Sequence, residues 1–168
     1  MGTDISMYVE QRIGDEWYFV GQMVEDELHQ YDPDDALEYR PESIYDRRHY
    51  SLFAILAGVR NDQEEPFEPI APLRGLPDDL SAELQVWYNY ALYDEIAGSP
   101  NPEKWFQTSW LTLEELARFD WYGKRKKINS LQSLTYTEVA DTFFTEILQG
   151  LWEAYGPTSD VRLVFDFC

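Results

Sequence analysis

The sequence predicts one α+β domain over residues 1–168, with a mainly antiparallel sheet that includes both terminal strands and about four helices packed on one face of it. Three observations lead to this prediction. Apolar residues alternate with period two near both ends of the chain, and they recur at spacings of three and four in the segments between. The 168 residues are 44% apolar and 16% aromatic, which is enough material for one packed core without disulfides or metals.

Two strand patterns define the predicted sheet. Alternate apolar side chains at 5–9, a Gly14-Asp15 turn and the apolar segment 17–20 predict a β-hairpin. At 161–167 apolar residues again alternate along a segment with few charges. Because a strand this apolar is usually buried inside a sheet, we expect it to pair there, beside the first strand.

Helical spacing predicts two helices in the middle of the chain. The first spans 50–59, where apolar residues recur at three and four and Gly58 lies near the end. The second follows Ser81, which can cap its N-terminus, and it is expected to stop before Gly98-Ser99-Pro100.

Two further helices each begin with a capping box, in which a Thr and a Glu three residues later bond each other's backbone N–H. Thr112 with Glu115 opens a short third helix. Thr135 with Glu138 opens a fourth helix, which is expected to run to Gly156-Pro157.

Acidic residues are concentrated in the first part of the chain. Residues 1–103 hold 23 acidic and six basic residues, whereas 104–168 hold nine and seven, within a formal net charge of −19. The acidic segment 25–42 is expected to be a solvated loop or a short helix, and 60–79 a long irregular connection. A surface of this sign repels phosphates and attracts basic proteins, although excess charge can also serve solubility alone.

The sequence lacks the common catalytic and metal-binding motifs. It has no Gly-rich phosphate loop, no paired Cys or Cys-His spacing, no His-Glu-x-x-His and no Gly-x-Ser-x-Gly elbow. The two histidines, His29 and His49, are more typical of surface or capping residues than of a general base. We therefore predict no catalytic residue, no metal and no cofactor. The basic run 124–127 is expected to be a solvated loop, or else a contact for phosphate or an acidic partner.

The single cysteine, Cys168, excludes an intrachain disulfide and favours a reducing compartment. No apolar run approaches the roughly 18 to 20 residues that span a bilayer. A cytoplasmic protein without membrane contact is therefore expected.

Five segments in series resemble one family of proteins. They read MGTDISMYVE at 1–10, YSLFAILAGVRN at 50–61, RGLP at 74–77, SWLTLEEL at 109–116 and VRLVF at 161–165. In order and spacing they resemble a family of small uncharacterised bacteriophage and prophage proteins, which implies a phage-type origin and not a reaction. The family usually has His at the position of Ser6 and His-Ser-His-Ser at 106–109, so three candidate ligands or bases are absent here.

Two functions from different classes follow. The first is an acidic accessory protein that binds a host protein with a basic surface in the host cytoplasm, with an anti-defence inhibitor that mimics nucleic-acid charge as its specific form. The acidic residues expected to contact the partner are Glu25, Asp26, Glu27, Asp32, Asp34, Asp35, Glu64, Glu65, Asp78 and Asp79. Direct binding to nucleic acid is not expected from this charge.

The alternative function is an enzyme or a small-ligand-binding protein. Its pocket is expected near Ser6, Gln107 and Thr108, with Arg60 or Arg74 holding an anionic group. Arg60 could instead cap the end of the first helix.

Overall fold

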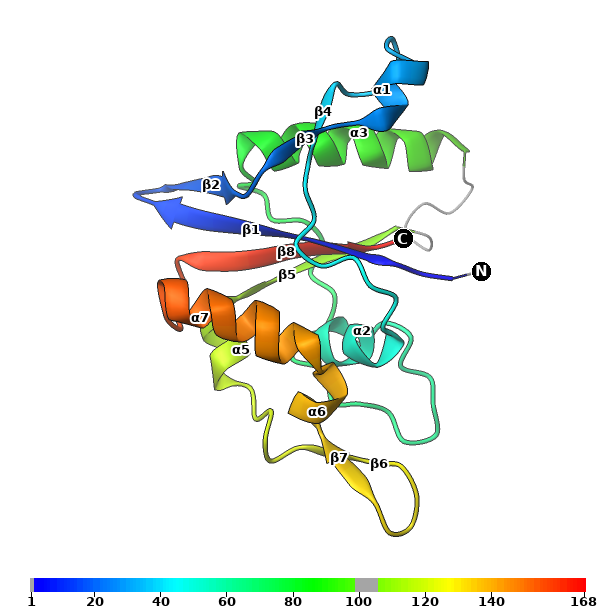
Figure 1. Ribbon diagram of the computed structural model, residues 1–168, viewed down its shortest axis with the longest axis vertical. Helices are drawn as coiled ribbons and strands as arrows, with labels where there is room; N and C mark the ends of the chain where they lie inside the picture. The colour runs from blue at the N-terminus through cyan, green and yellow to red at the C-terminus, as the bar shows by residue number, and fades with distance from the viewer. Residues whose placement is uncertain (1, 99–105) are drawn as a thin grey trace.

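The computed structural model describes residues 2–98 and 106–168, with the backbone alone for 93–98. At its centre lies a four-stranded antiparallel sheet with the strand order β2-β1-β8-β5 (Figure 1). The strands are β1 (Ile5–Ile13), β2 (Glu16–Val20), β5 (Gln107–Thr112) and β8 (Val161–Phe167). The predicted α+β class and the pairing of the two terminal strands are confirmed.

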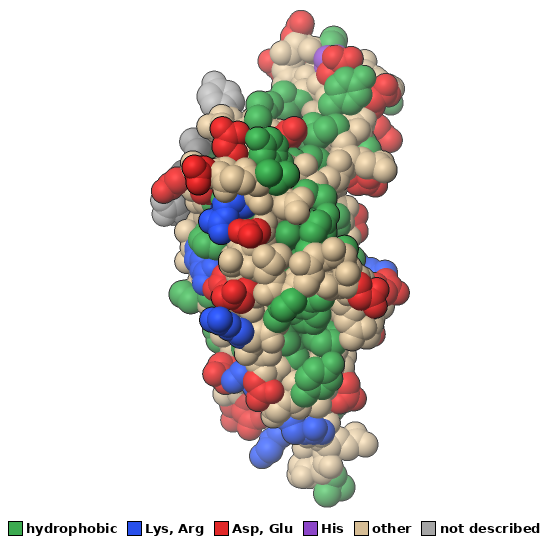
Figure 2. Space-filling model, turned by 90° about the vertical axis from the view of Figure 1, so that its left-hand side faces the viewer, with side chains coloured by type: hydrophobic (Ala, Val, Ile, Leu, Met, Phe, Trp, Pro, Cys, Tyr) green, Lys and Arg blue, Asp and Glu red, His purple; other side chains and the backbone are tan. Residues whose placement is uncertain are grey.

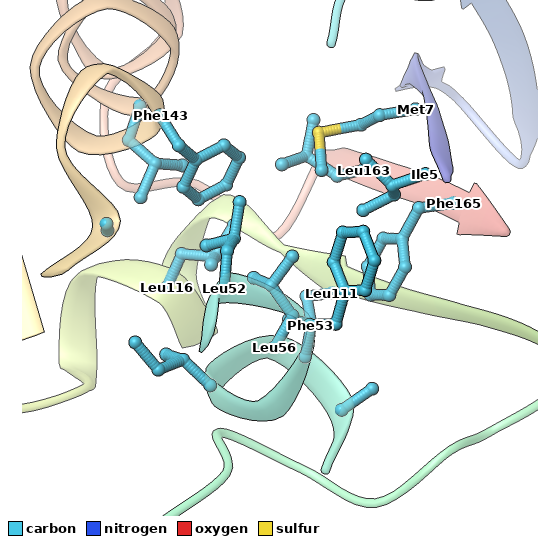
Figure 3. Close-up of a cluster of buried hydrophobic side chains, with 14 of the residues drawn as sticks. Ile5, Met7, Leu52, Phe53, Leu56, Leu111, Leu116, Phe143, Leu163 and Phe165 are labelled. Carbon is cyan, nitrogen blue, oxygen red and sulfur yellow. The ribbon is translucent and has the colours of Figure 1, made fainter. Parts of the chain in front are cut away.

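One face of the sheet packs against four helices and a π-helix. They are α2 (Tyr50–Ala57), α5 (Leu113–Arg118), α6 (Tyr136–Ala140), η1 (Phe143–Leu148) and α7 (Gln149–Tyr155). Figure 3 shows Ile5 and Leu163 of the sheet pointing toward Leu52 of α2 and Phe143 of η1. All four side chains are buried, so this face carries the larger core.

The opposite face of the sheet is covered by α3 (Ala82–Gly98), so the helices do not all lie on one face as predicted (Figure 1). Tyr8 of β1 and Val164 of β8 are buried there against Leu84 and Tyr88 of α3. The reason lies in β8, which is buried at every position. A strand that is buried on both sides needs an apolar layer on both faces of its sheet. Ser99 and Pro100, expected to stop α3, lie outside the described residues.

Both predicted capping boxes are present, but the fourth helix is interrupted. Thr112 Oγ1 accepts the Glu115 N–H at 3.1 Å, and Glu115 Oε1 accepts the Thr112 N–H at 3.1 Å; Thr135 and Glu138 form the same pair of bonds. After α6 the chain turns at Asp141, which has a φ of 52°, and continues as η1 and α7. The apolar stripe runs through this break, so its periodicity predicts a single helix.

Four short strands and one helix complete the fold: β3 (Met23–Glu25), α1 (Glu27–Tyr31), β4 (Tyr39–Pro41), β6 (Arg125–Lys127) and β7 (Ser133–Thr135). Strands β3 and β4 pair and flank α1, and we call residues 23–41 the acidic arm. Strands β6 and β7 pair as well, and we call residues 124–135 the basic hairpin. The arm and the hairpin lie at opposite ends of the long axis of the molecule (Figure 1).

Candidate functional site

The acidic arm carries charge of almost one sign. Residues 23–41 contain seven acidic residues and one arginine, Arg40. Asp26 is buried and its Oδ1 accepts the Leu28 N–H at 3.1 Å, so this carboxylate caps α1 and is not a partner contact. The other six carboxylates of the arm are exposed to solvent. No ion pair among the described residues joins these six carboxylates to a basic side chain, so the arm presents a negative surface.

Large apolar side chains are exposed on the same arm. Helix α1 buries none of its residues, and its Leu28 and Tyr31 are 60% and 85% exposed. Met23 and Tyr39 on the flanking strands are exposed as well. Figure 2 shows hydrophobic side chains beside acidic ones at the upper end of the molecule. An apolar centre with a charged rim is the usual composition of a protein-binding patch.

Hydrogen bonds hold the arm in a defined shape. The Asp26 N–H donates to Glu38 O at 3.0 Å, which extends the pairing of β3 and β4 toward α1. His29 Nδ1 donates to Ala36 O at 3.0 Å and closes the turn that follows α1. His29 thus has a structural bond, and the surface is ordered before a partner arrives, which lowers the entropic cost of binding.

Glu64 and Glu65 lie far from the arm, in the irregular connection after α2. Lys126 Nζ donates to Glu65 O, and Lys124 Nζ forms an ion pair with Glu68 at 2.6 Å. This connection therefore lies against the basic hairpin, at the end of the molecule opposite to the arm (Figure 1).

Asp78 and Asp79 lie in a third place, just before α3. Both line a groove of about 620 Å³, where Asp79 accepts a hydrogen bond from Arg162 Nη1 at 2.9 Å. The predicted partner residues are thus divided among three places, and the largest exposed group of them lies at 25–35, on the acidic arm.

Two tryptophans and three arginines alternate along this groove. The Cζ atoms of Arg12 and Arg162 lie 5.4 and 3.8 Å from the ring centroid of Trp17. Arg162 and Arg74 lie 5.8 and 4.6 Å from that of Trp110. We call these five side chains the arginine-tryptophan ladder. It draws on all four strands of the sheet, and cation–π contacts of this kind contribute about 0.5–2 kcal/mol each.

Each arginine of the ladder already has a carboxylate partner. The pairs are Arg12–Asp160 at 2.6 Å, Arg74–Glu115 at 2.8 Å and Arg162–Glu10 at 2.8 Å. Hydrogen bonding to Arg74 holds the pKa of Glu115 below its usual value. Glu10 and Arg162 are buried, and the Ser81 N–H also donates to Glu10 Oε2 at 2.6 Å. An anionic ligand would have to compete with these bonds, so the ladder is built as a structural brace.

The residues predicted for a ligand pocket are only partly brought together. Ser6 and Thr108 both pair with Asp166, from opposite sides of β8 and on the face covered by α3. Gln107 pairs with Phe167, so its side chain belongs to the opposite face of the sheet.

The two arginines predicted for that pocket lie in separate grooves. Arg60 donates to Thr3 Oγ1 at 2.6 Å, and it lines a groove of about 510 Å³ with His49 and Lys126. Arg74 belongs to the arginine-tryptophan ladder.

A buried carboxylate lies between Ser6 and Thr108. The hydroxyl of Tyr88 donates to Asp166 Oδ2 at 2.8 Å, and burial raises the pKa of Asp166 to about 7. Sequence reasoning missed this residue, as it missed the buried Arg162. Both charges lie on one face of an otherwise apolar strand, four residues apart, a pattern that could have marked them as buried polar groups.

His49 is held by the backbone at both ring nitrogens. Nδ1 accepts the Leu52 N–H at 3.4 Å, and Nε2 donates to Val139 O at 2.8 Å. In these bonds Nδ1 is the acceptor and Nε2 is the donor. His49 therefore caps α2 and joins it to α6.

Within residues 2–98 and 106–168, no group of three or more His, Cys, Asp or Glu is placed to hold a metal ion. Among the helices of the same residues, none is long and apolar enough to cross a membrane.

Comparisons of the chain with protein-family models, with curated proteins and with solved structures found no match.

Proposed function

We propose that this protein is a phage-type accessory protein that binds a host protein with a basic surface through the acidic arm. One observation carries the proposal: six exposed carboxylates and four exposed large apolar side chains share residues 23–41. The phage origin and the host cytoplasm as the place of action rest on the sequence resemblance.

The two kinds of side chain on the arm have different tasks. The carboxylates attract a basic partner over a distance of about a Debye length, roughly 8 Å at physiological salt, and they orient its approach. Leu28 and Tyr31 lie three residues apart on α1, so they share one face and can enter an apolar pocket together. Tyrosine is a frequent anchor of protein interfaces.

A nucleic-acid-binding protein is the partner class that fits this surface best. Such a protein presents Lys and Arg side chains that normally neutralise phosphates. Asp32, Asp34 and Asp35 offer closely spaced negative charges that can take the place of phosphates. A host protein bound to the arm would be kept from its nucleic acid, and this competition is how an anti-defence inhibitor would act.

The alternative of an enzyme or anion-binding protein has weaker support. Arg60 and Arg74 line separate grooves, so they do not hold one anionic group together. The arginines of the ladder already bond carboxylates.

Competition with DNA tests the proposal. Proteins captured from a bacterial lysate on the immobilised chain are purified one by one, and the release of a fluorescent DNA duplex from each is measured. We expect at least one captured protein to release its DNA in proportion to the amount of chain added. The same amount of chain should release less DNA at about 200 mM salt than at about 50 mM salt. If every captured protein keeps its DNA at saturating chain, the nucleic-acid-mimic function is wrong.

A further inference from the structure

The two most exposed large apolar side chains of the described residues lie at opposite ends of the molecule. Leu131 of the basic hairpin is 93% exposed, and Tyr31 of the acidic arm is 85% exposed. Each has a second exposed apolar neighbour, Ile128 at 58% and Leu28 at 60%. The hairpin segment itself carries four basic residues and no acidic one, with Glu65 and Glu68 of the neighbouring connection beside it, whereas the arm carries seven acidic residues and one arginine. We infer that the basic hairpin of one molecule docks on the acidic arm of a second copy of the chain.

The charge of the hairpin is available for such a contact. Residues 124–134 hold four basic residues and no acidic one. Lys124 forms an ion pair with Glu68, whereas Arg125 donates to Ser133 Oγ and Lys126 to a backbone carbonyl. Lys126 also lies 4.8 Å from the ring centroid of Phe67, and hydrogen bonding to Thr135 together with the charge of Arg125 lowers the pKa of Glu138. Within the described residues, no ion pair joins Arg125 or Lys127 to a carboxylate, and both side chains are exposed. The carboxylates of a second molecule's arm can provide those partners.

The apolar tip of the hairpin is held outward by its own turn. Asn129 Oδ1 accepts the backbone N–H groups of Leu131 and Gln132, both at 2.9 Å. This Asx-type turn fixes the backbone at the tip, where Leu131 is exposed to solvent. A partner can therefore contact Leu131 while the hydrogen bonds of the turn stay intact. On the arm, the Asp26 cap fixes α1 in the same way. Both surfaces are therefore ordered before they meet.

The contact can only form between molecules. The arm and the hairpin lie at opposite ends of the long axis (Figure 1), so one molecule cannot join its own two ends. The two surfaces differ, so the contact can repeat head to tail, or two antiparallel molecules can close it in a two-fold dimer in which each arm receives the other molecule's hairpin. Association should therefore give a dimer or a larger assembly as the concentration rises.

This inference uses the same acidic arm as the proposed function, but the hairpin has no part in binding a basic host protein, so changes to the hairpin separate the two. A hairpin variant with Ile128→Asp and Leu131→Asp leaves the arm intact. An arm variant with Leu28→Lys and Tyr31→Lys leaves the hairpin intact. Val86→Asp, at a 57% exposed position on α3, is the control for a new charge at an exposed apolar site.

Sedimentation velocity over a concentration series at about 0.15 M salt tests the inference. We expect the wild type and Val86→Asp to form dimers or larger assemblies as the concentration rises. The hairpin variant and the arm variant should each remain monomeric alone. An equimolar mixture of the two variants should form a dimer and nothing larger, because it retains one intact arm and one intact hairpin per pair.

Three outcomes would overturn the inference. The first is a wild type that stays monomeric up to about 0.1 mM, which corresponds to a free energy of association weaker than about −5.5 kcal/mol. The second is a hairpin or arm variant that still associates alone, and the third is a mixture of the two variants that stays monomeric. The proposed function is judged separately, because binding of a host partner by the hairpin variant reports on the arm alone.

Discussion

The guanidinium of Arg162 lies 3.8 Å from the ring centroid of Trp17, although their strands β8 and β2 are separated by β1. Arg162 reaches this position above Glu10, its cross-strand partner on β1 and its ion-pair partner at 2.8 Å. The side chain thus ties three strands together, and the carboxylate that it neutralises is buried. A charge in this place is tolerated only while both members of the pair remain.

Removing Arg162 should be strongly destabilising. Arg162→Ala leaves Glu10 buried without its cation, and breaking a buried pair in this way costs about 3–5 kcal/mol of unfolding free energy. Arg12→Ala is the control, because the Arg12–Asp160 pair is largely exposed and such pairs contribute about 0–1 kcal/mol. Urea denaturation of both variants measures the difference. If both variants lose the same free energy of unfolding, the buried pair contributes no more to stability than the exposed one.

Asp166 should make the protein less stable as the pH rises toward neutrality. Its folded-state pKa of about 7 lies above the usual value of about 3.9 for an unfolded chain. Between these two values the folded state holds a proton that the unfolded state has released, so the contribution of Asp166 to the free energy of unfolding falls with rising pH. Above pH 7 the full penalty for burying the charge is present, and below about pH 4 it is absent.

The substitution Asp166→Asn isolates this effect. Asparagine has nearly the same shape and no titrating proton, so the variant should gain stability relative to wild type as the pH rises through this window. Chemical denaturation at several pH values from about 4 to about 8 gives the difference curve. A difference that does not change with pH would refute the raised pKa.

Asp141 offers a stabilising substitution. Its φ of 52° and ψ of −123° are a conformation that glycine adopts readily and other residues adopt at a cost of about 1–3 kcal/mol. Asp141→Gly should therefore raise the free energy of unfolding by about 1 kcal/mol and the melting temperature by about 2–4 °C. Asp141→Ala removes the carboxylate but keeps the strain, so it should give no gain. If both variants melt at the same temperature, backbone strain is not the cause.

Local signals in the sequence predicted much of the fold. The capping boxes at Thr112 and Thr135 were readable because both partners of each bond lie three residues apart. The pairing of β1 with β8 followed from two terminal segments with the same period. The position of α3 was not predicted, because the alternation that buries Leu163 on one face does not say that Val164 needs a helix on the other.

The candidate site was less predictable than the fold. Acidic residues are recognised in a sequence without difficulty, but only the folded chain separates the arm from Glu64 and Glu65, which lie beside the hairpin. The ladder was also missed, because Trp17, Trp110 and Arg162 are far apart in the chain and meet only through the strand order.

The most direct measurement for the central claim compares two charge reversals of equal size. Asp34→Lys with Asp35→Lys changes the arm, and Glu64→Lys with Glu65→Lys changes the connection beside the hairpin; all four residues are exposed. The affinity of a purified basic partner for each variant is measured by calorimetry, with thermal melting as a check that both remain folded. The account predicts that the arm variant binds at least about tenfold more weakly, or about 1.4 kcal/mol, and that the other variant stays close to wild type. Equal affinities of the two variants would contradict it, because binding would then follow net charge and not the arm.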